Sequence, residues 1–185
     1  MAAREAHDEL GRDLYGNPCR ECGYDWSISP DDALSLMAAI PARYAALVGD
    51  RDGSQRHPDL SWSVGAYVCH VTDNVRIWAE RLAGCALGGE RNVPGYDENL
   101  LARARAYERV PVAGALWSLQ HAVDNWIEAV ERAMQERVVL IHAERGEQTA
   151  LDVVRNNTHD ACHHEWDIRR SIEHSDDCIE SPRKL

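Results

Sequence analysis

Hydrophobic residues recur at alternating spacings of four and three residues in two long stretches of the chain. In the first stretch, which begins near Ser61, the repeating positions are Val64, Val68, Val71, Val75, Trp78 and Leu82. In the second, which follows Pro111, they are Leu116, Gln120, Val123, Ile127, Val130 and Met134. This periodicity predicts two amphipathic helices that pack against others in a bundle.

Two more long helices are predicted on either side of this region. Residues 29–32 (SPDD) have the order of a helix start, with a capping serine, a proline at the first helical position and two acidic residues. This helix should extend to about Val48, and Pro41 should kink or divide it. The last helix should cover roughly residues 149–174, and a polar tail follows it.

The connections complete the predicted architecture. Glycine and proline between residues 84 and 95 mark a long connection, residues 97–108 are compatible with a short helix, and residues 137–142 with an extended segment. Four long helices with one long crossover predict an all-α fold, a four-helix bundle. Residues 1–28 are polar and are interpreted as an N-terminal extension, so the predicted bundle domain is residues 29–185.

Composition excludes several classes of partner. The chain of 185 residues carries 20 basic and 31 acidic residues, a net charge of −11, which argues against binding to a nucleic-acid backbone. Its apolar runs are too short to span a membrane, so no membrane association is expected. The first residues lack the apolar segment of a signal peptide, and six irregularly spaced cysteines indicate reduced thiols in a cytoplasm.

Three histidines carry the clearest chemical signal. His159 and His163 are four residues apart, so they lie on one helix face, and His70 lies at the border of the apolar stripe of another helix. Three imidazoles from two helices can hold a divalent metal and leave one coordination position open, as in catalytic metal sites. However, paired histidines on a helix are more often surface or hydrogen-bonded core residues.

The last helix carries two strips of residues that need burial. His159 and His163 share a strip with Asn156 and Trp166, which is well rotated from an aliphatic stripe made by Leu151, Val154, Ala161 and Ile168. Both strips can be buried only if this helix is enclosed on most sides. Spacing alone therefore does not prove that His70 meets the histidine pair.

The other histidines are weaker candidates. His164 follows His163 by one position and should point about 100° away, so it is interpreted as a residue that supports a ligand or faces solvent. His121 is the alternative third ligand, although a solvated or hydrogen-bonded histidine is the commoner case. No signal attaches to His7, His57, His142 or His174.

The N-terminal extension contains a single Cys-x-x-Cys knuckle, Cys19 and Cys22, which is half of a zinc ribbon. Either distant ligands such as His57 complete a structural zinc site, or the segment is a locally ordered turn, which is the default interpretation. The remaining cysteines stand alone: Cys69, Cys85, Cys162 and Cys178.

With these residues, the chain resembles the DinB-like superfamily, which includes the mycothiol-dependent maleylpyruvate isomerases. The matching positions are Trp62-Ser63, Cys69-His70-Val71 with Asp73, and His159-x-x-x-His163-His164. It is most similar to an actinobacterial branch that has an opening like residues 19–25 (CRECGYD) and a segment like residues 94–97 (PGYD). The resemblance spans most of the chain.

The resemblance implies an up-down-down-up four-helix bundle that holds zinc or nickel through His70, His159 and His163. In the maleylpyruvate isomerases one ligand is a glutamate, at the position assigned here to His159. Asp73 and Asp97 are candidate catalytic groups near the metal, and Asp97 is also a candidate contact for the thiol cofactor. Either can equally be a solvated acid, an interpretation slightly favoured for Asp73.

The sequence and the resemblance together favour a metal-dependent thiol S-transferase or isomerase that uses a mycothiol-like thiol and an electrophilic substrate. A metal held by neutral imidazoles lowers the pKa of a coordinated thiol, which makes this chemistry coherent. One alternative is a metal-binding stress or regulatory module without turnover, and another is a metal-dependent hydrolase. A homodimer is compatible with the sequence.

Overall fold

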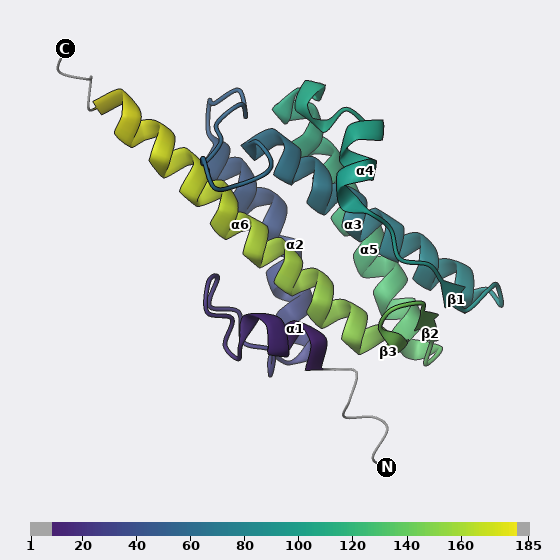
Figure 1. Cartoon of the computed structure of the whole chain (residues 1–185). Coiled ribbons are helices and arrows are strands. Elements are labelled where there is room, and N and C mark those ends of the chain that lie inside the picture. Colours follow the sequence, from purple (N-terminus) through teal and green to yellow (C-terminus); the bar gives the residue numbers. More distant parts are fainter. Residues whose placement is uncertain (1–8, 181–185) are drawn as a thin grey trace.

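The computed structural model describes residues 9–180 of the chain. Its helices are α1 (Glu9–Tyr15), α2 (Pro30–Val48), α3 (Val64–Ala86), α4 (Glu98–Ala104), η1 (Tyr107–Arg109), α5 (Val112–Gln135) and α6 (Ala150–Glu180). Its strands are β1 (Asn92–Val93), β2 (Val139–His142) and β3 (Gly146–Thr149). The four long helices α2, α3, α5 and α6 form the predicted bundle (Figure 1). None of the helices in residues 9–180 is long and apolar enough to cross a membrane.

Two of the long helices begin with a serine cap, at Ser29, which the sequence analysis predicted, and at Ser63, which it did not single out as a cap. Ser29 accepts a hydrogen bond from the backbone N–H of Asp32 at the start of α2, and Ser63 caps α3 in the same way. The serine oxygens satisfy N–H groups that have no partner inside the helix. Helix α2 continues through the buried Pro41 as one helix, so this proline does not divide it.

The bundle has the up-down-down-up topology. Helix α3 packs on α5 and α6, and α2 packs on the other sides of the same two helices. Tyr44 donates a hydrogen bond to the carbonyl of Ala161 (2.7 Å), and Arg51 pairs with Asp176 (2.7 Å). Residue numbers therefore rise together along α2 and α6, which run parallel, as the resemblance implies.

The core confirms one predicted stripe and shifts the other. The stripe of α3 is buried throughout, from Val64 to Leu82. On α5, Val123 and Val130 are buried as predicted, but Gln120 and Met134 are exposed. The buried face of α5 instead centres on Trp126, whose indole N–H donates to Asn157. One large ring fixes the rotation of this helix more strongly than the aliphatic pattern does.

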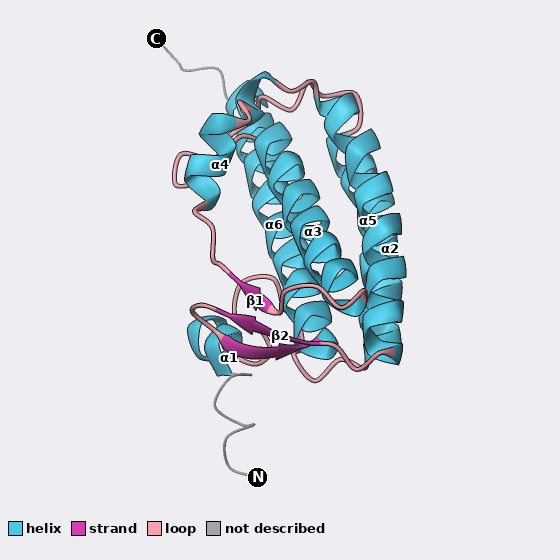
Figure 2. Cartoon of the chain, turned by 90° about the vertical axis from the view of Figure 1, so that its right-hand side faces the viewer, coloured by secondary structure: helices cyan, strands magenta, loops and turns pink. Residues whose placement is uncertain are grey.

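A small sheet lies at one end of the bundle (Figure 2). Strand β1 pairs parallel with β2, and β2 pairs antiparallel with β3. Sequence analysis expected an extended segment only at residues 137–142, because β1 has two residues and β3, although as long as β2, has the polar sequence GEQT without an apolar run.

The N-terminal segment, residues 9–28, lies across helix α6 (Figure 1). Its buried residues Cys19, Tyr24 and Trp26 form a small cluster of their own, with the partly buried Cys162 of α6 packed against it. Helix α6 is therefore covered by α2, α3 and this segment. Residues of both the histidine strip and the aliphatic stripe are consequently buried, as His159 and Ile168 show.

Candidate functional site

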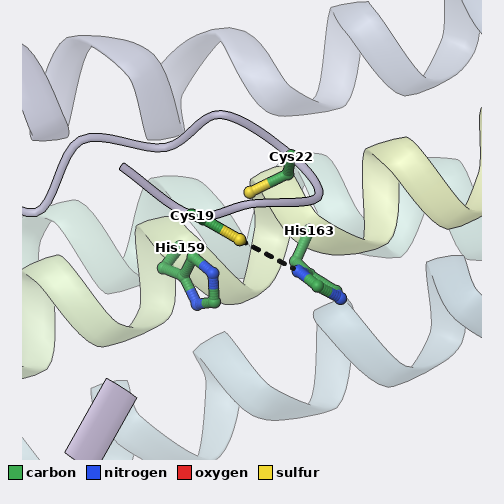
Figure 3. A group of neighbouring side chains, drawn as sticks. All are labelled: Cys19, Cys22, His159 and His163. Atoms are coloured by element: carbon green, nitrogen blue, oxygen red, sulfur yellow. Dashed lines mark hydrogen bonds between the residues drawn. The ribbon is translucent and has the colours of Figure 1, made fainter. Parts of the chain in front are cut away.

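Two groups of potential metal ligands lie along α6. The first, the Cys–His group, consists of Cys19, Cys22, His159 and His163 (Figure 3). The second, the His–Asp group, consists of His70, Asp160 and His164. Within each group, one ligand atom of every residue lies within 4.8 Å of the others.

The structure distributes the three predicted ligands over these two groups. His159 and His163 lie with the cysteines of the N-terminal segment, while His70 of α3 lies with Asp160 and His164. The physical reason is helix geometry, because residues 160 and 164 are rotated about 100° from residues 159 and 163. One face of α6 meets the N-terminal segment and the adjacent face meets α3.

The knuckle of the Cys–His group is a tight turn. The backbone N–H of Gly23 donates to the carbonyl of Cys19 (3.0 Å), and the N–H of Cys19 donates to the carbonyl of Tyr24 (2.8 Å). Gly23 has a φ of +76°, a conformation that side-chain-bearing residues rarely adopt. The turn brings both thiols to the side of the loop that faces α6 (Figure 3).

The imidazoles of this group are packed among aromatic rings. The ring of His159 lies 4.4 Å from that of Trp26 and 4.9 Å from that of Tyr15. Burial, with a smaller contribution from His163, lowers the pKa of His159 to about 4, so this imidazole is neutral at physiological pH. Burial also raises the pKa of Cys22 to about 12, so its thiol keeps its proton unless a positive charge is nearby.

The His–Asp group converges on one carboxylate. The Nε2 atoms of His70 and His164 lie 3.7 Å and 3.5 Å from the carboxylate oxygens of Asp160. Tetrahedral ligands at normal zinc distances are about 3.3–3.5 Å apart when they are nitrogen or oxygen, so this set fits a divalent ion after small shifts. Asn74 also donates to Asp160 (2.7 Å), and His164 Nδ1 lies 3.0 Å from Asp167. A carboxylate on the far nitrogen commonly orients a metal-binding histidine.

The charges in this group are strongly coupled. Burial alone would lower the pKa of His164, but the carboxylates of Asp160 and Asp167 raise it to about 9. Burial alone would raise the pKa of Asp160, but the charge of His164 and hydrogen bonds from both histidines lower it well below its usual range. The carboxylate therefore attracts a positive charge at this point, which either a proton on His164 or a cation can provide.

A pocket of about 570 Å³ opens beside the His–Asp group. Its walls come from α1, α3, α6, the sheet and the loop before α4, and they include Trp62, Asn74, Arg81, Tyr96, Arg145 and Gln148. Arg81 stacks on the ring of Trp78, and its buried Nη1 atom has no hydrogen-bond partner among the described residues. Buried donors in native proteins are nearly always paired, so this atom is a candidate contact for a ligand in the pocket that Arg81 lines.

The two candidate catalytic aspartates have structural contacts. Asp73 is buried rather than solvated, pairs with Arg76 and Arg105, and accepts a hydrogen bond from Tyr107 (2.6 Å). Asp97 caps helix α4 by accepting from the N–H of Leu100 (2.8 Å). The roles in catalysis and cofactor binding that the sequence suggested for them stay predictions.

The alternative histidines lie elsewhere. His57 packs against His174 (5.2 Å between ring centroids), and His121 is exposed on α5 beside Trp117. Sequence reasoning did not name Asp160 as a candidate ligand and assigned His164 only a supporting role. The available signal was that Asp160 and His164 have the same four-residue spacing as the histidine pair.

Residues 32–168 match the family model of the DinB superfamily. The chain belongs to the DinB superfamily. Among solved structures, this DinB protein is similar to YfiT from Bacillus subtilis, with a TM-score of 0.69 and 19% sequence identity over 81% of this chain and 91% of that one. YfiT is described as a probable metal-dependent hydrolase with an unusual four-helix bundle topology. No curated protein matches the sequence.

Proposed function

We propose that this DinB protein is a metal-dependent enzyme that uses a low-molecular-weight thiol, of the mycothiol kind, as an S-transferase or isomerase. The observation that carries the proposal is the His–Asp group at the pocket, His70, Asp160 and His164. Two imidazoles and a carboxylate suit zinc or nickel and leave a coordination position open. Asp160 also supplies the carboxylate that the maleylpyruvate isomerases have among their ligands.

A divalent ion bound by this group would lower the pKa of a thiol at its open position, so that the thiol becomes a nucleophile at neutral pH. The chain's own residues support this role. Asp167 orients the imidazole of His164. The amide N–H of Asn74 donates to the carboxylate of Asp160, and the amide oxygen of Asn74 accepts a hydrogen bond from the hydroxyl of Tyr96 (3.3 Å). These contacts fix the directions of the ligand atoms.

The pocket also indicates the chemistry of the substrate. The unpartnered Nη1 of Arg81 is a buried cationic donor, and Arg145 lies in the same pocket. Each guanidinium group can donate charge-assisted hydrogen bonds to a carboxylate, which are roughly twice as strong as neutral ones, although the acidic residues Glu98 and Glu144 line the same pocket. We therefore expect the electrophilic substrate to carry a carboxylate, while the polar walls formed by Gln148 and Asn156 suit a hydroxyl- and amide-rich thiol.

The test is a thiol titration of the cobalt-substituted full-length protein. The addition of mycothiol should produce a sulfur-to-metal charge-transfer band beyond any present without thiol, and the band should strengthen as pH rises, because coordination requires the deprotonated thiol. His70→Ala should abolish this increment, and His121→Ala, a substitution of an exposed histidine outside both groups, should leave it unchanged.

Failure to respond to mycothiol, bacillithiol, glutathione and cysteine would overturn the thiol proposal. Metal-dependent hydrolysis is then the second candidate, with water at the open position, and it is favoured by the description of YfiT. Arg81→Met should reduce the affinity for carboxylate-bearing substrates, while the metal content should be unchanged, since Arg81 belongs to neither group of ligands.

A further inference from the structure

We propose that Cys19, Cys22, His159 and His163 form a second, closed zinc site that fastens the N-terminal segment to helix α6. This site shares no ligand with the His–Asp group. It is structural, and it does not depend on the reaction that the pocket catalyses.

The donor set matches the ion. Two thiolates and two imidazoles are a common tetrahedral ligand set of structural zinc. At normal zinc distances such ligand atoms are about 3.3–3.8 Å apart. Sγ of Cys19 already lies 3.8 Å from Nδ1 of His163, and all four ligand atoms lie within 4.8 Å of one another. The longest separation therefore needs to shorten by about 1 Å, which side-chain rotations can provide.

The backbone of the knuckle is already folded for coordination. The hydrogen bonds from Gly23 to Cys19 and from Cys19 to Tyr24 close the turn, and the positive φ of Gly23 lets the chain reverse. Both thiols consequently face the two imidazoles on the adjacent helix (Figure 3).

The imidazoles provide a second and independent indication. The buried Nε2 atom of His159 has no hydrogen-bond partner among the described residues. Such atoms are rare in native interiors and point to a bound ligand. Nε2 of His163 lies 3.0 Å from the carboxylate of Glu21, which fixes the proton on Nε2 and leaves Nδ1 free to bind an ion beside Cys19. A carboxylate–histidine–metal arrangement of this kind is typical of zinc sites.

The N-terminal segment forms part of the pocket wall. Leu14, Tyr15 and Trp26 of the N-terminal segment line the pocket, together with His159 and His163. An ion that joins the knuckle to α6 would therefore hold one wall of the pocket in place. The described cluster that holds this segment to α6 is small, so an ion bound by the knuckle and α6 would add to the contacts that order residues 9–28.

The experiment compares metal content in single variants of the full-length protein. Cys22→Ser and His163→Ala should each lose one equivalent of zinc, while Cys162→Ser should lose none, since Cys162 is next to His163 but outside the group. His70→Ala should lose only the other equivalent, so failure of the proposed function leaves this result intact. Hydrogen exchange should show lost protection in residues 9–28 of Cys22→Ser and unchanged protection in α3 and α5.

The zinc site can also be tested on the unmodified protein, so that the result does not depend on whether the variants fold. Zinc should protect Cys19 and Cys22 from alkylation at least tenfold, as read by mass spectrometry, and should not protect the exposed Cys178. Equal alkylation with and without zinc, or full zinc content in Cys22→Ser, would overturn the proposal. A Cys19–Cys22 disulfide in freshly purified protein that binds no zinc after reduction would overturn it as well.

Discussion

Removal of the Asp73 carboxylate distinguishes a structural role from the catalytic role that the sequence suggested. Asp73 is buried and receives three contacts, from Arg76, Arg105 and the hydroxyl of Tyr107. The Asp73→Ala variant loses all three and leaves a buried tyrosine hydroxyl without its acceptor.

The expected loss of stability follows from the exposure of the partners. The side chains of Arg76 and Arg105 are 38% and 45% exposed, so solvent screens each ion pair to less than about 1 kcal/mol. The hydrogen bond from Tyr107 to a charged acceptor contributes about 1.5–3 kcal/mol. Asp73→Ala should therefore destabilise the protein by about 3 kcal/mol, which lowers Tm by roughly 6–12 °C in a chain of this size.

Urea unfolding followed by circular dichroism measures this loss, and Tyr107→Phe is the matched control. Phe at 107 removes only the hydroxyl and its hydrogen bond, so we expect a cost of about 1.5–3 kcal/mol. The double variant should be less destabilised than the sum of the two, because both substitutions remove the same hydrogen bond. The reasoning is refuted if Asp73→Ala unfolds within about 0.5 kcal/mol of the unmodified protein yet loses its response to thiol.

Four further outcomes test other parts of the structure. Asp97→Ala removes a helix cap and should lower the free energy of unfolding by about 1 kcal/mol in urea. A loss of more than about 1 kcal/mol in the free energy of thiol binding would support the predicted cofactor contact. In metal-free protein, the raised pKa of His164 stabilises the fold below about pH 6.5, and this contribution should disappear as pH rises through about 9. His164→Gln should remove this fall in stability between about pH 6.5 and 9. The lowered pKa of His159 acts in the opposite sense, so stability should fall as pH drops from about 6.5 to 4. Tyr44→Phe should cost about 1 kcal/mol by differential scanning calorimetry, and no loss would show that its buried hydrogen bond contributes nothing net.

The sequence by itself determined the helices. The cap at Ser29 and the stripe from Val64 to Leu82 depend only on neighbours along the chain, so periodicity and capping chemistry predict them. The rotation of α5 was less certain, because its buried face is set by the fit of Trp126 against other helices. The bundle class followed from the number and lengths of the helices, and the resemblance supplied its topology.

Tertiary structure decided how the ligands are grouped. Adjacent pairs on α6, residues 159 and 163 beside residues 160 and 164, have the same spacing, and sequence periodicity cannot say which pair faces α3. That choice depends on the rotation of α6, and this rotation is fixed by packing against α2, α3 and the N-terminal segment together. The same packing brings Cys19 to His163, a contact across 144 residues that no local pattern encodes.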